Sequence, residues 1–302
     1  MPTSANLRGA LFMCLAMAGF TLNDALVKSV SGAMNAGQIM FVRGLLTTLL
    51  VFLIARHMGA LRPLSVLALP AVALRIAAEV IASVSYIYAL GRIPLANASA
   101  ILQALPLAVT LGAALFLKEP VGWRRWLAIL AGFAGVLVVL RPGPDGFGFA
   151  ALAAILSVVF AATRDLCTRR IPLEIPSLLI SAVTAAVITL AGGLLIMPLG
   201  GWQPVGAAEL GHLAVASVLL LLGYQCIVMA MRTGEISLIA PFRYTSLIWS
   251  IGIGMLVFAE LPDRTMVVGI AIIVTSGLYT FHRERRRGAT PVARVSSPGS
   301  PK

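Results

Sequence analysis

Ten apolar runs, each close to the length of a membrane-crossing helix, follow one another along the chain. A helix crosses the ~30 Å hydrocarbon core of a bilayer with about 20 residues. The chain is 59% hydrophobic and only 11% charged, too few charges to cover a soluble protein of this size. We therefore predict an all-α integral membrane protein with spans at 8–28, 37–55, 66–90, 95–117, 124–140, 148–166, 177–199, 211–231, 236–258 and 265–282.

The basic residues predict the orientation of these spans. If the N-terminus is cytoplasmic, fifteen Lys and Arg residues fall on the cytoplasmic side, and four fall outside, namely Lys28, Arg92, Arg141 and Arg264. An excess of Lys and Arg in cytoplasmic loops is the usual topology signal. Both termini are therefore expected in the cytoplasm, with the chain in a bacterial inner membrane. The net charge of +12 is explained by topology and does not indicate nucleic-acid binding, since no basic stripe with interleaved aromatics is present.

A shift of 141 residues superimposes several features of the two halves. Asn23-Asp24 falls on Arg164-Asp165, and Glu119 falls on Glu260. Five spans in each half place the second half in the opposite orientation, and inverted repeats of this kind are characteristic of secondary transporters. We predict a first repeat at 8–140, a second, inverted repeat at 148–282 and a disordered cytoplasmic tail at 283–302.

Short motifs follow one another in order along the two halves. They are Ala98-Ser99-Ala100-Ile101, Leu117-Lys118-Glu119-Pro120, Gly132-Phe133-Ala134-Gly135, Ala240-Pro241-Phe242-Arg243-Tyr244 and Phe258-Ala259-Glu260. Over about 8–282 this pattern resembles the EamA-type proteins of the drug/metabolite transporter superfamily. The resemblance implies ten helices around a central cavity and alternating-access transport of a small metabolite. The Pro-Phe-Arg-Tyr segment is similar to carriers described as importers of riboflavin or S-adenosylmethionine; export of amino acids, other metabolites or drugs by the same fold is the alternative.

Polar side chains inside the spans are the candidate site, because a charge at the bilayer centre costs about 2.5–3.5 kcal/mol on insertion scales. Arg75 and Glu79, four residues apart on one helix, form either a proton-handling site or a self-neutralising pair. Arg43 is interpreted mainly as a structural partner of Asp24, which Lys28 can also neutralise. The predicted substrate-binding residues are Arg43, Arg75, Glu79, Gln103, Tyr224, Gln225, Arg243 and Trp249, and the predicted proton-coupling residues are Glu79 and Asp24.

The remaining polar groups carry weaker indications. Asp165 is interpreted as a solvated partner of the adjacent Arg164, and Glu119 and Glu260 as helix-end contacts. The three cysteines and three histidines are scattered, so no metal site and no cofactor are expected. A membrane enzyme remains a weaker alternative because the chain contains no HExxH or P-loop motif, and a channel is a third. The expected partners are the lipid bilayer and a small-molecule substrate, with either a monomer or a homodimer.

Overall fold

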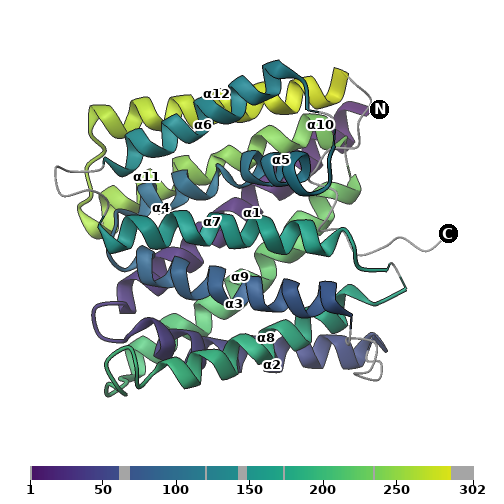
Figure 1. Cartoon of the computed structure of the whole chain (residues 1–302). Helices are drawn as coiled ribbons and strands as arrows, with labels where there is room; N and C mark the ends of the chain where they lie inside the picture. Colours follow the sequence, from purple (N-terminus) through teal and green to yellow (C-terminus); the bar gives the residue numbers. More distant parts are fainter. Residues whose placement is uncertain are drawn as a thin grey trace.

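The computed structural model describes residues 2–60, 69–119, 121–141, 148–172, 174–233 and 235–286, which form helices and their connections and contain no strand. The helices run roughly parallel or antiparallel to one another across the bundle (Figure 1). They are α1 (Pro2–Val30), α2 (Ala36–His57), α3 (Pro70–Leu90), α4 (Leu95–Leu102), α5 (Leu105–Phe116), α6 (Trp123–Leu140), α7 (Phe149–Thr168), α8 (Ser177–Leu195), α9 (Ala207–Thr233), α10 (Ile236–Ile239), η2 (Ala240–Tyr244), α11 (Thr245–Phe258) and α12 (Arg264–Arg286).

The ten predicted spans are present, and two of them are broken. Within the described ranges, nine helical segments are long and apolar enough to cross a membrane. The fourth span consists of α4 and α5, which meet at Gln103 and Ala104, and the ninth consists of α10, the 3₁₀ turn η2 and α11. The breaks are related by the same shift of 141, since Gln103 corresponds to Tyr244. Discontinuous helices of this kind expose backbone polar groups only where protein or a cavity covers them.

Helix packing between the halves follows a two-fold relation. The most extensive contacts join α1 to α9, α3 to α7, α2 to α8 and α6 to α12. In Figure 1 the α6–α12 pair lies at one edge of the bundle and the α2–α8 pair at the other, with α1, α3, α7 and α9 between them. The repeat exchanges α1 with α7 and α3 with α9, so the first two contacts interchange and the other two map onto themselves. This pattern confirms the predicted architecture of two inverted five-helix repeats.

The fourth and ninth spans also end in the same backbone motif. Lys118 and Ala259 adopt left-handed conformations with φ of 54° and 53°. Directly after them, the N–H of Glu119 donates to the carbonyl of Ala113 at 3.2 Å, and the N–H of Glu260 donates to that of Gly254 at 2.9 Å. In both spans a left-handed residue ends the helix, and the next N–H satisfies a carbonyl six residues earlier that would otherwise be free, as helix C-caps do. Each acid is therefore fixed at the end of its span by the backbone.

Glycines allow the paired helices of the two halves to approach at backbone distance. On α6 and α12, a Cβ on Gly135 would lie 3.0 Å from the carbonyl oxygen of Gly269, and a Cβ on Gly269 would lie 2.9 Å from that of Gly135. Small residues at helix crossings serve this purpose in membranes, where packing rather than the hydrophobic effect drives association.

Gly269→Ala is therefore expected to lower the thermal stability of the protein in nanodiscs, because the new methyl group meets backbone that cannot move aside. Gly252→Ala on α11 is the matched control, since nothing lies within 4 Å of a Cβ there and replacing a helical glycine by alanine gains about 0.5–1 kcal/mol. Equal melting temperatures for the two variants would contradict this packing.

The last helix extends beyond its predicted end. α12 continues to Arg286, so the first four residues of the tail predicted at 283–302 are helical, and the remainder of that tail lies outside the described residues. At its start, Asp263 accepts the N–H of Met266 at 2.9 Å and pairs with Arg141 at the end of α6. The Met266 N–H, with further bonds from Thr265 and Arg141, holds the pKa of the Asp263 carboxyl below its usual value.

Candidate functional site

A first polar cluster joins α1, α2 and α3. Tyr86 donates its hydroxyl to Asp24 at 2.6 Å, and the amide of Asn23 donates to the same carboxylate at 2.9 Å. Arg43 bonds the Asn23 oxygen at 3.2 Å. Arg43 is thus linked to Asp24 through Asn23, which lies between them, and it interacts with the acid itself only at longer range.

A second cluster joins α3, α7 and α8. Arg164 donates to Glu79 and to Asp165, each at 2.8 Å. Arg75 instead donates to the hydroxyls of Thr168 at 3.1 Å and Thr184 at 2.8 Å. The expected self-neutralising pair of Arg75 and Glu79 is thus not formed as a contact, because an arginine from the other repeat takes the carboxylate. The adjacent Arg164–Asp165 pair is present, but both side chains are largely enclosed rather than solvated, with 22% and 30% exposure.

Tyr224 on α9 lies between these two clusters. It is within electrostatic range of Arg43 from the first cluster and of Arg75, Glu79 and Arg164 from the second. Its ring packs edge-on against Phe20 with centroids 5.2 Å apart, yet the residue is 52% exposed. A side chain that is both exposed and surrounded by charges from both halves faces an open polar space between them, so Tyr224 belongs to the candidate site.

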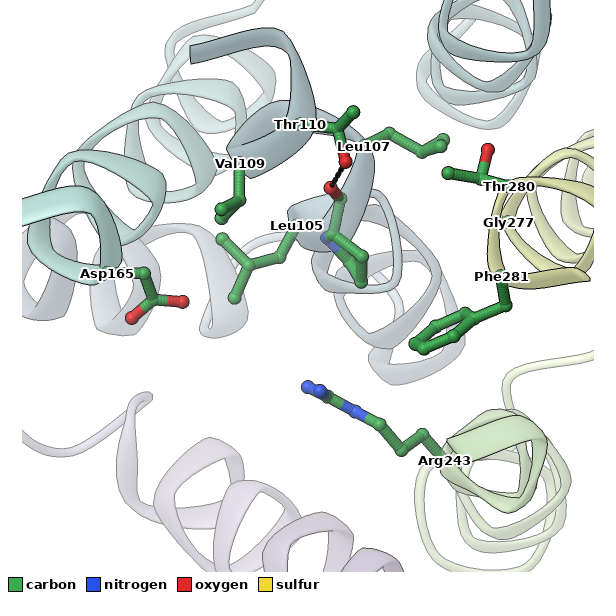
Figure 2. Close-up of a pocket in the computed structure, with 10 residues that line it drawn as sticks. Leu105, Leu107, Val109, Thr110, Asp165, Arg243, Gly277, Thr280 and Phe281 are labelled. Carbon is green, nitrogen blue, oxygen red and sulfur yellow. Dashed lines mark hydrogen bonds between the residues drawn. The ribbon is translucent and has the colours of Figure 1, made fainter. Parts of the chain in front are cut away.

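A cavity adjoins the second cluster and contains Arg243. Its empty space, counted out to the mouth, is about 480 Å³, and its walls come from α5, α7, η2 and α12. Figure 2 shows the Arg243 guanidinium projecting into this space from one side and the Asp165 carboxylate from another. Gln103 fixes the arginine's backbone, because its amide donates to the Arg243 carbonyl at 3.3 Å and to the Ser246 hydroxyl. Gln103 thus joins the two helix breaks and is itself buried.

Two predicted residues do not join this arrangement. Trp249 is 43% exposed, and Gln225 is also exposed. Among the described residues, no hydrogen bond, ion pair or ring contact connects either side chain to the other candidates. They were predicted as site residues because they are polar or aromatic and lie within spans. The sequence does not show on which face of its helix such a residue lies.

Two ion pairs close the opposite ends of the bundle. At the end where α1 finishes, here called the Lys28 end, Lys28 pairs with Glu260 at 3.0 Å. At the other end, the Arg169 end, Arg169 pairs with Glu119 at 3.1 Å. A shift of 141 converts Lys28 into Arg169 and Glu119 into Glu260, so one pair is the repeat image of the other. The expectation that Lys28 neutralises Asp24 is therefore wrong.

The two end pairs differ in how firmly they are held. The Lys28 ammonium also donates to the carbonyls of Leu90 and Ile93 at 3.2 and 2.5 Å, and Glu260 accepts the Leu95 N–H at 2.7 Å. The predicted helix-end role of Glu260 is thus present together with an ion pair. In the Arg169–Glu119 pair Glu119 is 48% exposed, against 21% for Glu260. The shared offset of all four residues was the signal that could have revealed both pairs from the sequence.

The fold and the site are those of a membrane transporter. The five spans are repeated in inverted orientation, broken helices face each other, charged clusters lie between the halves, and an ion pair lies at each end. The chain belongs to the EamA-like transporter family, whose pattern matches twice, over 7–141 and 148–281. This membership confirms the predicted transporter and excludes the membrane enzyme that the sequence left as an alternative.

Named relatives in this family transport different molecules. The pseudopaline exporter CntI of Pseudomonas aeruginosa is 30% identical over 89% of this chain and 94% of its own length. The riboflavin transporter of Vibrio cholerae is 27% identical over 93% and 95%, and the S-adenosylmethionine uptake transporter of Rickettsia prowazekii is 26% identical over 93% and 94%. One crystal structure shares the fold, with a TM-score of 0.61 and 21% identity over 96% of this chain and 100% of the other.

Proposed function

We propose that this protein is a secondary carrier that moves a small metabolite across a bacterial inner membrane by alternating access. The observation that carries the proposal is the pair of repeat-related ion pairs, Lys28–Glu260 and Arg169–Glu119, at opposite ends of one bundle. Because the halves are inverted copies, exchanging their conformations exchanges the state of the two ends. Opening one pair at a time would admit substrate from one side and release it to the other.

The orientation of the carrier follows from the positive-inside argument. With both termini cytoplasmic, the Lys28 end faces outward and the Arg169 end faces the cytoplasm. The cavity beside Asp165 and Arg243 then lies in the cytoplasmic half. Since the Lys28 pair has three additional bonds to backbone and the Arg169 pair is more exposed, the cytoplasmic end is the one that opens more readily from this conformation.

The substrate path runs past both polar clusters. We place Arg43, Tyr224, Arg75 and Glu79 along it, with Arg243 at the cavity and Gln103 holding the helix breaks rather than contacting substrate. Of the two acids proposed for proton coupling, Asp24 suits that role better. It is held by neutral donors and has no ion pair within 4.0 Å among the described residues, whereas Glu79 is neutralised by Arg164.

The carrier proposal predicts saturable counterflow. Proteoliposomes preloaded with unlabelled riboflavin, S-adenosylmethionine or a mixture of amino acids should accumulate the same labelled compound transiently above equilibrium for at least one of the three. Liposomes without protein are the negative control. Liposomes that contain an unrelated carrier able to transport the compound are the positive control for each assay. Flux without saturation or overshoot would indicate a channel, and no flux for any of the three would remove these substrate classes.

The same assay tests the coupling acid. Asp24→Asn should abolish the acceleration of transport by an imposed pH gradient while leaving counterflow at equal pH within a few-fold of the unaltered protein. Glu79→Gln is the matched comparison, and it should impair transport at every pH because it leaves Arg164 with only Asp165. A pH response that survives Asp24→Asn and disappears in Glu79→Gln would return the coupling role to Glu79.

A further inference from the structure

Arg243 is a cation without a partner at the wall of the cavity. Its guanidinium makes no hydrogen bond and no ion pair within 4.0 Å with any other residue in the described part of the chain, whereas Arg43, Arg75 and Arg164 each bond to polar side chains. The guanidinium points into the cavity (Figure 2). An arginine enclosed in a membrane protein is costly unless an anionic or acceptor group compensates it, so the missing partner is expected to arrive with a ligand.

The neighbouring charges do not supply that partner. Arg75 and Arg164 stand against Glu79 and Asp165, and Arg164 contacts both acids directly. These four charges cancel, so none of them compensates the positive charge of Arg243. Gln103 fixes the backbone at Arg243. This limits the positions that the Arg243 side chain can reach.

Asp165, on α7, lines the same cavity. One of its oxygens accepts from Arg164, and the carboxylate lines the cavity. It is within electrostatic range of Arg243, but the two do not approach within ion-pair distance among the contacts of the described residues. A cation and an anion that face each other across a gap favour a ligand that carries both opposite charges.

A further donor lies beside the arginine. The Tyr244 hydroxyl is buried and has no hydrogen-bond partner among the described residues. It fits into the space that Gly277, a residue of the cavity wall, leaves by lacking a side chain. Arg243 and Tyr244 are adjacent in η2, so two donors without partners lie next to each other: Arg243 lines the cavity, and the Tyr244 hydroxyl is buried behind its Gly277 wall.

We infer that the cavity binds the headgroup of a zwitterionic, amino-acid-like metabolite, with its carboxylate on Arg243 and its ammonium on Asp165. The inference rests on the proposed carrier function and specifies its substrate class. The planar guanidinium matches a carboxylate bidentately, while the Asp165 carboxylate repels a second anion. A neutral ligand would leave Arg243 uncompensated, which disfavours an uncharged heteroaromatic ring as the group bound here.

Binding to the purified protein in nanodiscs tests this without requiring transport. The probes are S-adenosylmethionine, each of the twenty proteinogenic amino acids and riboflavin, measured by the shift in melting temperature and then by titration. We expect at least one amino-acid-type probe to bind. The carboxamide of that probe should bind at least ~10-fold more weakly to the unaltered protein, a difference of about 1.4 kcal/mol, because it loses the charge-assisted bidentate bond to the guanidinium.

Variants assign each end of the probe to its residue. In Arg243→Gln, the acid and its carboxamide should bind equally, and Arg243→Lys should restore part of the difference because it keeps the charge but not the bidentate geometry. N-acetylation removes the ammonium charge of the probe. The loss of affinity that N-acetylation causes should therefore be smaller in Asp165→Asn than in the unaltered protein. Size-exclusion profiles of all variants establish that they remain folded.

The inference is overturned if only riboflavin binds, if no amino-acid-type probe binds, or if carboxamide and acid bind the unaltered protein alike. Each of these outcomes is distinguishable from failure of the carrier proposal. Counterflow of riboflavin together with the first outcome would retain the carrier and reject the zwitterion site. Absence of counterflow together with zwitterion binding that depends on Arg243 would retain the site and reject the carrier.

Discussion

Glu260→Gln is expected to loosen the Lys28 end of the bundle by about 10- to 100-fold in local opening while the Arg169 end remains closed. The substitution removes the charge that Lys28 faces at 3.0 Å, and hydrogen bonds to charged groups contribute about 1.5–3 kcal/mol. Lys28 keeps its two carbonyl acceptors, and the glutamine oxygen can still accept the Leu95 N–H. The change therefore weakens the closure without leaving a group wholly unsatisfied.

Amide hydrogen exchange in nanodiscs measures this opening at both ends at once. Peptides that cover 88–97 and 254–262 should exchange faster in Glu260→Gln, whereas those around 113–119 and 164–170 should not change. Glu119→Gln is the control supplied by the repeat, and it should show the reverse pattern. Its effect should be smaller, because the Arg169–Glu119 pair is already more exposed and exposed ion pairs contribute about 0.2–1 kcal/mol.

The transport consequences of the two variants separate a gate from a simple structural contact. If the ion pairs close the two ends in turn, Glu260→Gln should shift the carrier toward the outward-open state and Glu119→Gln toward the inward-open state. The ratio of the inward to the outward transport rate should therefore change in opposite directions in the two variants. Faster exchange at both ends in either variant would show general destabilisation and would contradict independent closure.

The fold was largely predictable because it depends on span length, the order of spans and one sequence offset. These features are local or periodic, and they predicted the spans and the two inverted repeats. The breaks in the fourth and ninth spans were not predicted, because each lies within a single apolar run. The continuation of α12 to Arg286 was missed because charged residues after an apolar run do not stop a helix; they only end its contact with lipid.

Several of the polar residues predicted for the site lie near one another, but their pairing was not predicted. Arg43, Arg75, Glu79, Tyr224 and Arg243 belong to or lie beside the two polar clusters and the cavity, as expected for charged and polar groups within a membrane. Two partners on the same helix were assigned wrongly, whereas the adjacent Arg164–Asp165 pair is present. Glu79 pairs with Arg164 from the other repeat, and Lys28 pairs with Glu260 rather than Asp24, because inter-repeat distances depend on helix crossing and not on sequence spacing.

Replacing the arginine that joins the repeats, as Arg164→Gln, is expected to have the largest effect on stability. Arg164 contacts Glu79 and Asp165 at 2.8 Å each, and it belongs to α7 while Glu79 belongs to α3, so the contact crosses the repeat interface. Removing one partner of a buried ion pair costs about 3–5 kcal/mol because the remaining charge is left uncompensated. Here two carboxylates would remain, with Arg75 engaged by threonine hydroxyls.

The double variant Arg164→Gln/Glu79→Gln provides the decisive comparison. It removes one of the two uncompensated negative charges and leaves Asp165 balanced by Arg75. It should therefore recover part of the melting temperature that Arg164→Gln loses. Arg170→Gln makes the same chemical change at an exposed position just beyond α7 and should alter stability by no more than about 0.5 kcal/mol. Thermal unfolding in nanodiscs measures all three. If Arg164→Gln behaves like Arg170→Gln, the cluster is solvated and carries no stability; if Glu79→Gln gives no recovery, the loss arises from packing of the arginine side chain and not from its charge.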